Sequence, residues 1–291
     1  MDTYYIDGKF VDDADAKISV KDIIVLRAFG IFDYLITYNK RPFYLHEHVD
    51  RFENSAKNIG LKLNHTHDEI CDIVVETIKR NPHHNESAIR IVHSGGISSD
   101  SVTPEGNGIF MVIAVPSIPF PATCYKDGAS IVTVEMERFM PDTKSTSYLC
   151  AVLAQQKAKE CGAIEAVYVD RSNRVLEGTT SNIFCFRENT LITPPDTILC
   201  GITRDVVLKL AKEHYPIEIR HIDMYQLMHM DEIFLTSSNK EVMPVVKVNG
   251  SAVGTGNGQE AGICKGPGSR TRHVMQLFKE YTVNYGKGSV A

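Results

Sequence analysis

Three short segments in the second half of the chain combine residue types that can do chemistry. They are Lys144-Ser-Thr-Ser-Tyr148, Glu177-Gly-Thr-Thr-Ser-Asn182 and Gly201-Ile202-Thr203-Arg204. A lysine amine can act as a nucleophile and as a proton carrier, and the N–H groups at a helix start can bind an anion. Each segment alone is weak evidence, because most lysines and glutamates are solvated surface charges.

Together the three segments resemble the class IV (fold type IV) aminotransferase family. That family includes branched-chain aminotransferases, D-amino acid transaminases and aminodeoxychorismate lyases. The signature E-x-T-x-S-N-I-F is followed at short intervals by L-I-T-P and G-I-T-R. The strings IDGKFV, GIFDYLITY, HEHVDRFENSAKNIG, EVMPVVKVNG and GPGSRTR agree with the same pattern. The resemblance therefore extends over nearly the whole chain, from about Tyr5 to about Arg272.

The resemblance implies a pyridoxal 5'-phosphate enzyme in which Lys144 forms the Schiff base with the cofactor. A free lysine has a pKa of about 10.4, so the site must lower it by desolvation or nearby positive charge. The released amine is then suited to move a proton between the substrate Cα and the cofactor. Glu177 matches the acid that keeps the pyridine nitrogen protonated. Tyr148 matches the hydroxyl that bonds the phenolic oxygen, and a helical 144–148 segment would place Lys144 and Tyr148 on one face.

The cofactor phosphate needs hydrogen-bond donors and positive charge. Gly201-Ile202-Thr203 opens an expected helix, where Thr203 is interpreted as the N-cap and the N–H groups suit an anion. By resemblance, Arg51 adds charge-assisted hydrogen bonds. Further positions that match the family's cofactor-binding set are Asn182, Ile202, Thr203, Ser237 and Ser238. Asn182 belongs to the signature, and it either contacts the cofactor or only supports the loop.

Three cations are candidates for binding the substrate. Arg27 lies in R-A-F-G-I-F, a slightly shortened loop that resembles a subgroup whose arginine reaches a substrate carboxylate across a dimer. Arg90 occupies the arginine position of the branched-chain pattern Y-I-R-P, without its tyrosine and proline. Lys240 follows the serine turn. Such cations suit 2-oxoglutarate or glutamate, and equally the two carboxylates of aminodeoxychorismate.

Two reactions consequently fit the motifs. The first is transamination between a branched-chain L-amino acid or a D-amino acid and a 2-oxo acid. The second is the lyase reaction that releases pyruvate and 4-aminobenzoate from 4-amino-4-deoxychorismate. Both use Lys144 and the same cofactor, so the cofactor motifs do not separate them. A cofactor-binding protein without turnover is disfavoured by the intact set of Lys144, Tyr148 and Glu177.

Composition excludes several other classes of function. The net charge is -5, the pI is about 6.1 and no basic stripe occurs, so we expect no nucleic-acid partner. We expect no membrane segment, because no apolar run approaches the roughly 20 residues that a bilayer requires. We expect no signal peptide either, because the N-terminus has no basic n-region and no apolar h-region. The seven scattered cysteines contain no C-x-x-C pair and suggest a reducing, cytoplasmic location. We interpret neither His46 with His48 nor the solvated pair His83-His84 as a metal site, so no metal is expected.

The elements that must position these residues follow from periodicity and turn signals. Asp7-Gly8 predicts a hairpin, and residues 30–38 read as a strand. Apolar spacing predicts helices over Leu45–Ile59, Asp68–Lys79, Leu149–Cys161, Thr203–His214 and Arg270–Tyr281. The glycine-rich stretch 254–268 reads as a loop.

Mixed helices and strands in both halves predict two α+β domains. Three prolines in residues 116–121 predict a linker, because proline is excluded from helix interiors and central strands. The expected division is a smaller domain over 1–115 and a larger one over 122–291 that carries Lys144. Ligands often bind at domain interfaces, so we expect the cofactor there. The resemblance further implies a homodimer.

Overall fold

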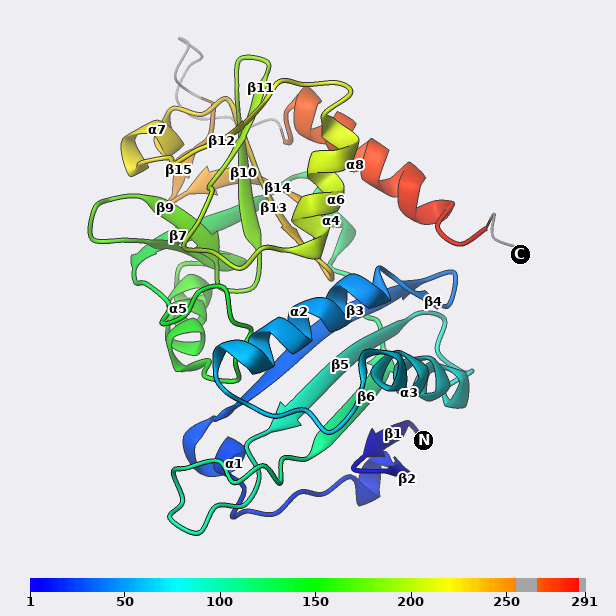
Figure 1. The fold of residues 1–291 in the computed structure, drawn as a ribbon. Coiled ribbons are helices and arrows are strands. Elements are labelled where there is room, and N and C mark those ends of the chain that lie inside the picture. The colour runs from blue at the N-terminus through cyan, green and yellow to red at the C-terminus, as the bar shows by residue number, and fades with distance from the viewer. Residues whose placement is uncertain (255–265, 288–291) are drawn as a thin grey trace. The chain divides into compact units, whose positions relative to one another are not determined.

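The computed structural model describes residues 1–254 and 266–287, which form two compact units (Figure 1). Unit 1 contains residues 1–118, the short segment 143–148 and residues 283–287. Unit 2 contains Pro119–Asp142 and Leu149–Thr282. Most of the loop expected over 254–268 lies outside the described residues. Within those residues, no helix combines the length and the apolar character needed to cross a bilayer.

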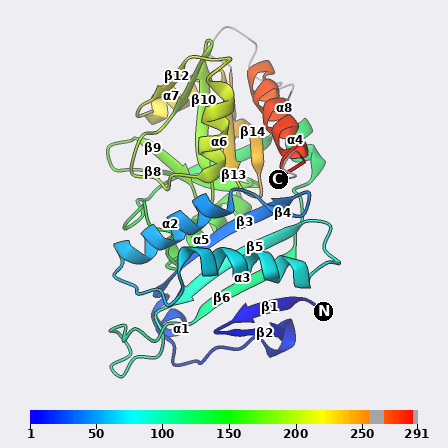
Figure 2. The ribbon, with the colours of Figure 1, turned by 45° about the vertical axis from the view of Figure 1, so that its right-hand side comes forward.

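Unit 1 is built on an antiparallel sheet with strand order β2-β1-β6-β5-β3-β4. The strands are β1 (Thr3–Ile6), β2 (Lys9–Asp12), β3 (Gly30–Tyr38), β4 (Arg41–Pro42), β5 (Ser87–Ser94) and β6 (Phe110–Pro116). Helix α1 (Ile23–Arg27) precedes β3, and α2 (Leu45–Asn58) and α3 (His67–Arg80) cover one sheet face (Figure 2). Val49 and Phe52 of α2 and Val74 of α3 pack onto Ile89 and Ile91 of β5 in one buried core.

The local signals of unit 1 explain these elements. Asp7 and Gly8 have φ values of 44° and 88°, so the Asp-Gly pair supplies the two positive φ angles of a tight hairpin turn between β1 and β2. Thr66 and Glu69 form a reciprocal capping box that begins α3. The predicted hairpin, the strand over 30–38 and both helices of this half are confirmed.

Residues 143–148 group with unit 1 because they add to the edge of β3. The N–H of Phe32 donates to the Lys144 carbonyl at 2.9 Å, and the N–H of Thr146 donates to the Gly30 carbonyl at 2.9 Å. The N–H of Lys144 in turn donates to the Ser55 hydroxyl at 3.1 Å. Residues 144–148 are therefore non-helical, so the condition under which Lys144 and Tyr148 would share a helix face is not met. A single domain boundary near residue 116 does not anticipate this return of the chain.

Unit 2 contains a larger mixed sheet, with strand order β12-β11-β10-β13-β14-β7-β8-β9 and β15 paired to β14. The strands are β7 (Ala129–Glu135), β8 (Glu165–Val169), β9 (Val175–Gly178), β10 (Asn182–Arg187), β11 (Thr190–Thr193), β12 (Ile217–Ile219), β13 (Glu232–Ser237), β14 (Glu241–Val248) and β15 (Ser251–Ala252). The helices are α4 (Ala122–Lys126), α5 (Leu149–Glu160), α6 (Ile202–Ala211), α7 (Met224–Met228) and α8 (Ser269–Val283). The predicted helices of this half are confirmed to within a few residues at their ends.

Candidate active site

In unit 1, Phe32 of β3 brings the predicted Schiff-base lysine and the predicted tyrosine together. The Lys144 ammonium lies 4.7 Å from the centroid of the Phe32 ring, and the Tyr148 ring lies 5.3 Å from the same ring. Asn58 of α2 donates to the hydroxyl of Thr143 at 3.0 Å and fixes the start of the segment. The two side chains thus meet through an aromatic contact rather than through a helix face, on a backbone held by β3 and α2.

A buried charge cluster joins β3 to α2, with Asp33 on the strand and His48 and Arg51 on the helix. Asp33 is fully buried, and it accepts hydrogen bonds from Arg51 at 2.9 and 2.8 Å and contacts His48 Nδ1 at 2.7 Å. Burial alone would raise the pKa of Asp33, but the charges of Arg51 and His48 outweigh it and hold that pKa well below its ordinary value. Burial also lowers the pKa of His48. Arg51 is therefore anchored by a carboxylate, and its contact with a phosphate stays a prediction.

The two arginines proposed for the substrate occupy exposed positions of unit 1. Arg27 ends α1, and its guanidinium donates to the Leu26 carbonyl at 2.8 Å. Arg90 extends from β5 with its guanidinium 5.5 Å from the centroid of the Tyr34 ring. Their exposure leaves both able to meet a solute, and their contact with a substrate carboxylate stays a prediction.

In unit 2, Glu177 is a buried carboxylate with two firm partners. It lies at the end of β9 and is 4% exposed. Arg138 donates to its Oε1 at 3.0 Å, and the N–H of Leu199 donates to its Oε2 at 2.9 Å. A guanidinium partner favours the charged form of a carboxylate. Arg138 belongs to no motif that we identified, so no signal in the sequence pointed to this contact.

Asn182, the last polar residue of the signature, acts on the same short backbone segment as Glu177. Its side-chain amide donates to the Leu199 carbonyl at 2.8 Å, while Glu177 accepts from the Leu199 N–H. The two signature residues therefore fix both polar groups of Leu199. A Cβ atom at Gly201 would collide with Asn182 Oδ1, so a larger residue there would displace the Asn182 side chain. Asn182 thus supports the loop that leads into α6.

The start of α6 is suited to an anion. Its N-cap is Gly201, which has no side chain to accept from the first N–H groups, so the expectation that Thr203 is the N-cap is wrong. Ile202 and Thr203 instead form the first turn of a ten-residue helix. N–H groups of a first turn have no partner within the helix and carry its positive dipole end. This donor set fits a phosphate group.

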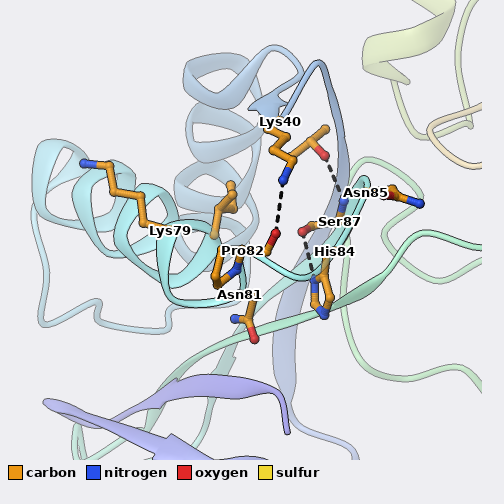
Figure 3. A pocket seen from close by; sticks show the side chains of 9 residues that line it. Lys40, Lys79, Asn81, Pro82, His84, Asn85 and Ser87 are labelled. Atoms are coloured by element: carbon orange, nitrogen blue, oxygen red, sulfur yellow. Dashed lines mark hydrogen bonds between the residues drawn. The ribbon is translucent and has the colours of Figure 1, made fainter.

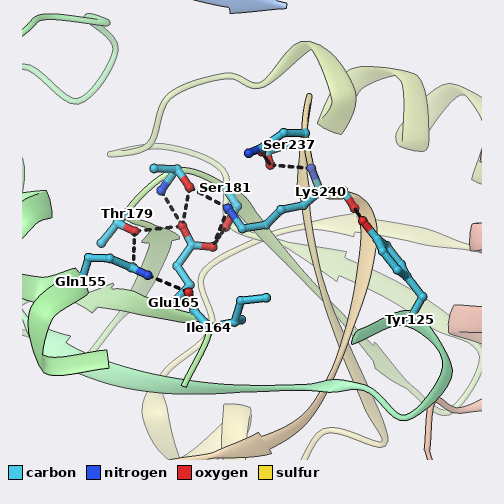
Figure 4. A network of polar contacts seen from close by, with 10 residues as sticks. Tyr125, Gln155, Ile164, Glu165, Thr179, Ser181, Ser237 and Lys240 are labelled. Carbon is cyan, nitrogen blue, oxygen red and sulfur yellow. Dashed lines mark hydrogen bonds and ion pairs between the residues drawn. The ribbon is translucent and has the colours of Figure 1, made fainter. Parts of the chain in front are cut away.

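The turn after β13 carries the two predicted phosphate serines and Lys240 (Figure 4). Ser237 and Ser238 are both half-buried, and the Ser237 hydroxyl accepts from the N–H of Lys240 at 3.3 Å. Lys240 is only 4% exposed, and its ammonium donates to the Thr180 hydroxyl at 2.7 Å and lies 3.3 Å from Glu165. Its charge is thus met by an internal carboxylate. Binding of a substrate carboxylate by Lys240 stays a prediction.

Glu165, which the sequence did not indicate, organises the signature turn. Its carboxylate accepts hydrogen bonds from the hydroxyls of Thr179, Thr180 and Ser181 at 2.9, 2.8 and 2.7 Å, and from the Thr180 N–H at 2.6 Å (Figure 4). Lys240 supplies the opposite charge. Burial would raise the pKa of Glu165, but Lys240 and these donors keep that pKa below its usual value. The network links the signature turn to the serine turn.

A cavity of about 180 Å³ lies elsewhere in unit 1, near the turn between α3 and β5 (Figure 3). Its lining includes Lys40, Asn81, His84 and Ser87, and Lys40 donates to the Pro82 carbonyl at 3.1 Å. None of the predicted catalytic residues lines it. His84 is 4% exposed and contacts Ser87 Oγ at 3.0 Å, so the prediction that it is solvated is wrong. The cause is the N-terminal segment, whose Asp2 lies 2.9 Å from His84 Nε2 and covers this histidine.

Comparisons with known proteins agree with these features. The family described as amino-transferase class IV matches residues 30–248. The chain is 35% identical to the "Putative branched-chain-amino-acid aminotransferase" of Methanocaldococcus jannaschii, with 97% of each chain covered. It is 32% identical to the D-alanine aminotransferase of Staphylococcus haemolyticus, with 97% of this chain and 98% of that one covered.

Comparison with solved structures identifies the same family fold. The T.th. branched-chain amino acid aminotransferase with pyridoxamine 5'-phosphate has a TM-score of 0.88 and 26% identity, covering 97% of this chain and 94% of that one. The predicted α+β fold of the fold type IV enzymes is confirmed, and it is built on two sheets. The chain belongs to the class IV aminotransferase family of pyridoxal-phosphate-dependent enzymes.

Proposed function

We propose that this aminotransferase acts on branched-chain L-amino acids or on D-amino acids, with Lys144 as the residue that binds the cofactor covalently. The observation that carries the proposal is the setting of Lys144. Its backbone is held by Phe32 and Ser55, and its amine lies over an aromatic ring beside Tyr148. The backbone of Lys144 is thus fixed, and its half-buried side chain brings the amine, which can act as a nucleophile, beside two aromatic rings.

The roles of the other residues follow from their chemistry. Bound pyridoxal phosphate supplies an electron sink for the substrate carbon that loses a proton. Lys144 takes that proton from the substrate Cα and returns it. Glu177, paired with Arg138, holds a proton on the pyridine nitrogen. Tyr148 donates its hydroxyl to the phenolic oxygen.

Phosphate binding is assigned to the first turn of α6 and to the serine turn. Ile202 and Thr203 offer N–H groups, and Ser237 and Ser238 offer hydroxyls. Arg51 adds positive charge from α2. The donor set combines neutral N–H and O–H groups with one guanidinium, which suits a dianion.

A half-reaction tests the proposal. Purified holoenzyme is mixed with one amino donor at a time, namely L-leucine, D-alanine, D-glutamate or L-glutamate, and the visible absorbance band of the cofactor is followed. Loss of the band with L-leucine or D-alanine, together with release of the matching 2-oxo acid, supports the proposal and identifies the preferred hand. Pyruvate release from aminodeoxychorismate, without a response to any amino acid, would instead establish the lyase reaction.

Glu177→Gln is expected to retain the cofactor and to reduce kcat by about 10²–10³-fold, the scale of losing one preorganised electrostatic partner. A neutral amide cannot hold the pyridine nitrogen protonated, so the carbon that loses its proton is stabilised less. Steady-state kinetics and cofactor content provide the measurement. Glu160→Gln, at the exposed end of α5, is the matched control. An unchanged kcat in Glu177→Gln would assign the role to another group.

A further inference from the structure

Helices α2 and α3 place three metal-binding side chains together at the surface of unit 1. His46 is the second residue of α2, His67 is the first residue of α3, and Cys71 follows His67 by four residues. Residues four apart on a helix lie on one face, so His67 and Cys71 both turn toward α2. The ligand atoms of the three side chains lie within 4.8 Å of one another.

The distances match those between ligands of one tetrahedral ion. His46 Nδ1 lies 3.1 Å from His67 Nε2 and 3.7 Å from Cys71 Sγ. Zinc–nitrogen bonds of about 2.0–2.1 Å and zinc–sulfur bonds of about 2.3 Å at a tetrahedral angle give spacings of about 3.3 and 3.6 Å. His46 Nδ1 meets both His67 Nε2 and the Cys71 thiol in hydrogen-bond contacts, and a bound ion would replace these contacts.

The second nitrogen of His67 has the partners that a metal-bound histidine usually has. Nδ1 of His67 lies 3.4 Å from Glu53 Oε2 and 3.5 Å from Asp50 Oδ1, both on α2. A carboxylate that accepts from the outer N–H fixes the tautomer and turns the lone pair of the other nitrogen toward the ion. The site therefore contains carboxylates that can orient His67, in addition to the three side chains that can bind the ion.

The local charge is negative, which favours a cation. Burial raises the pKa of the Cys71 thiol to about 11, and the carboxylates of Asp68, Asp72, Glu53 and Asp50 add to this effect. A divalent ion bound by the thiolate would offset this negative charge.

We propose that His46 Nδ1, His67 Nε2 and Cys71 Sγ bind a divalent ion of the Zn²⁺ type, with water as the fourth ligand. Mixed imidazole and thiolate ligands select zinc over magnesium or calcium. The sequence predicts no metal because its spacing suggests His46 and His48 as the pair to consider. In the structure, His48 instead contacts the Asp33 carboxylate. The ion would tie α2 to α3 and so stabilise the helix that carries Arg51.

Metal titration of the holoenzyme tests the site. Co²⁺ is expected to give visible bands of a four-coordinate ion and a thiolate charge-transfer band, at one ion per chain. Calorimetry with Zn²⁺ is expected to report one binding site per chain. Cys71→Ser should remove the charge-transfer band, and Glu53→Gln should weaken Zn²⁺ binding by about 10-fold, as outer-shell losses do.

Two further variants keep the test decisive. His46 is exposed, so His46→Ala should leave the fold intact while it abolishes the four-coordinate Co²⁺ bands. The matched control is His83→Ala in the separate group formed by Asp2, His83 and His84, which should leave the bands unchanged. The proposal is overturned if Co²⁺ shows no thiolate band, if His46→Ala binds as the wild type does, or if His83→Ala removes the signal.

Discussion

We expect Lys144→Ala to abolish both the visible absorbance of the bound cofactor and aminotransferase turnover. The substitution removes the amine that forms the covalent link and the group that moves the substrate proton. General acid–base catalysis alone contributes about 10²–10⁴-fold, so the loss of activity should reach at least the upper end of that range. Absorbance spectra and steady-state assays with the preferred amino donor measure the two effects.

Lys159→Ala is the control for Lys144→Ala, because Lys159 is an exposed lysine in the last turn of α5. Reduction of the wild-type holoenzyme with borohydride followed by peptide mapping should find the cofactor attached to Lys144. An unchanged visible band in Lys144→Ala, or attachment of the cofactor to another lysine, would refute the assignment.

The second large effect concerns stability and the buried pair of Glu165 and Lys240. Lys240→Ala is expected to lower the free energy of unfolding by about 3–5 kcal/mol, because it leaves a buried carboxylate without its cation. Glu165 is 1% exposed, so water cannot replace the lost ammonium. Urea unfolding of the holoenzyme measures the change. Lys126→Ala, at the end of α4, is a control in which the lost charge comes from a solvated lysine.

A double variant tests whether the unpaired charge of Glu165 causes the loss of stability. Glu165→Gln with Lys240→Met removes both charges, so it should recover most of the stability that Lys240→Ala loses. A loss as large as in the single variant would show that the missing ion pair does not cause the loss of stability.

The pKa of Glu165 is lowered in the folded state. Its contribution to the free energy of unfolding is therefore complete above the unfolded pKa of about 4.3 and disappears as pH falls through the folded pKa. The double variant should therefore lose less stability in acid than the wild type.

Local patterns predict most elements but few of the site's contacts. The spacing of Val49, Phe52 and Ala56 predicts α2, because the buried face of an amphipathic helix places apolar residues three or four positions apart. The signature around Glu177 likewise predicts the family. Nothing local predicts Arg138 as the partner of Glu177, since the two residues are far apart in the chain and Arg138 has no motif.

Three features of the structure follow from tertiary contacts that no local pattern predicts. The loop that carries Lys144 adds to the edge of β3 through strand hydrogen bonds. Lys240, in the turn after β13, lies beside the buried Glu165. His84 reads as solvated until Asp2 covers it. In each case the decisive partner lies far away in sequence.

The repeated return of the chain to unit 1 has a consequence for protein synthesis. Domains generally fold as the ribosome releases them, N-terminal first. Here the edge of β3 near Phe32 lacks its partner until residue 146 has emerged, and Tyr44 at the start of α2 forms its hydrogen bond with Tyr285 only after residue 285 has emerged. An unpaired strand edge is a template for association with other chains. The nascent first half is therefore the stage at which we expect this protein to depend most on chaperones.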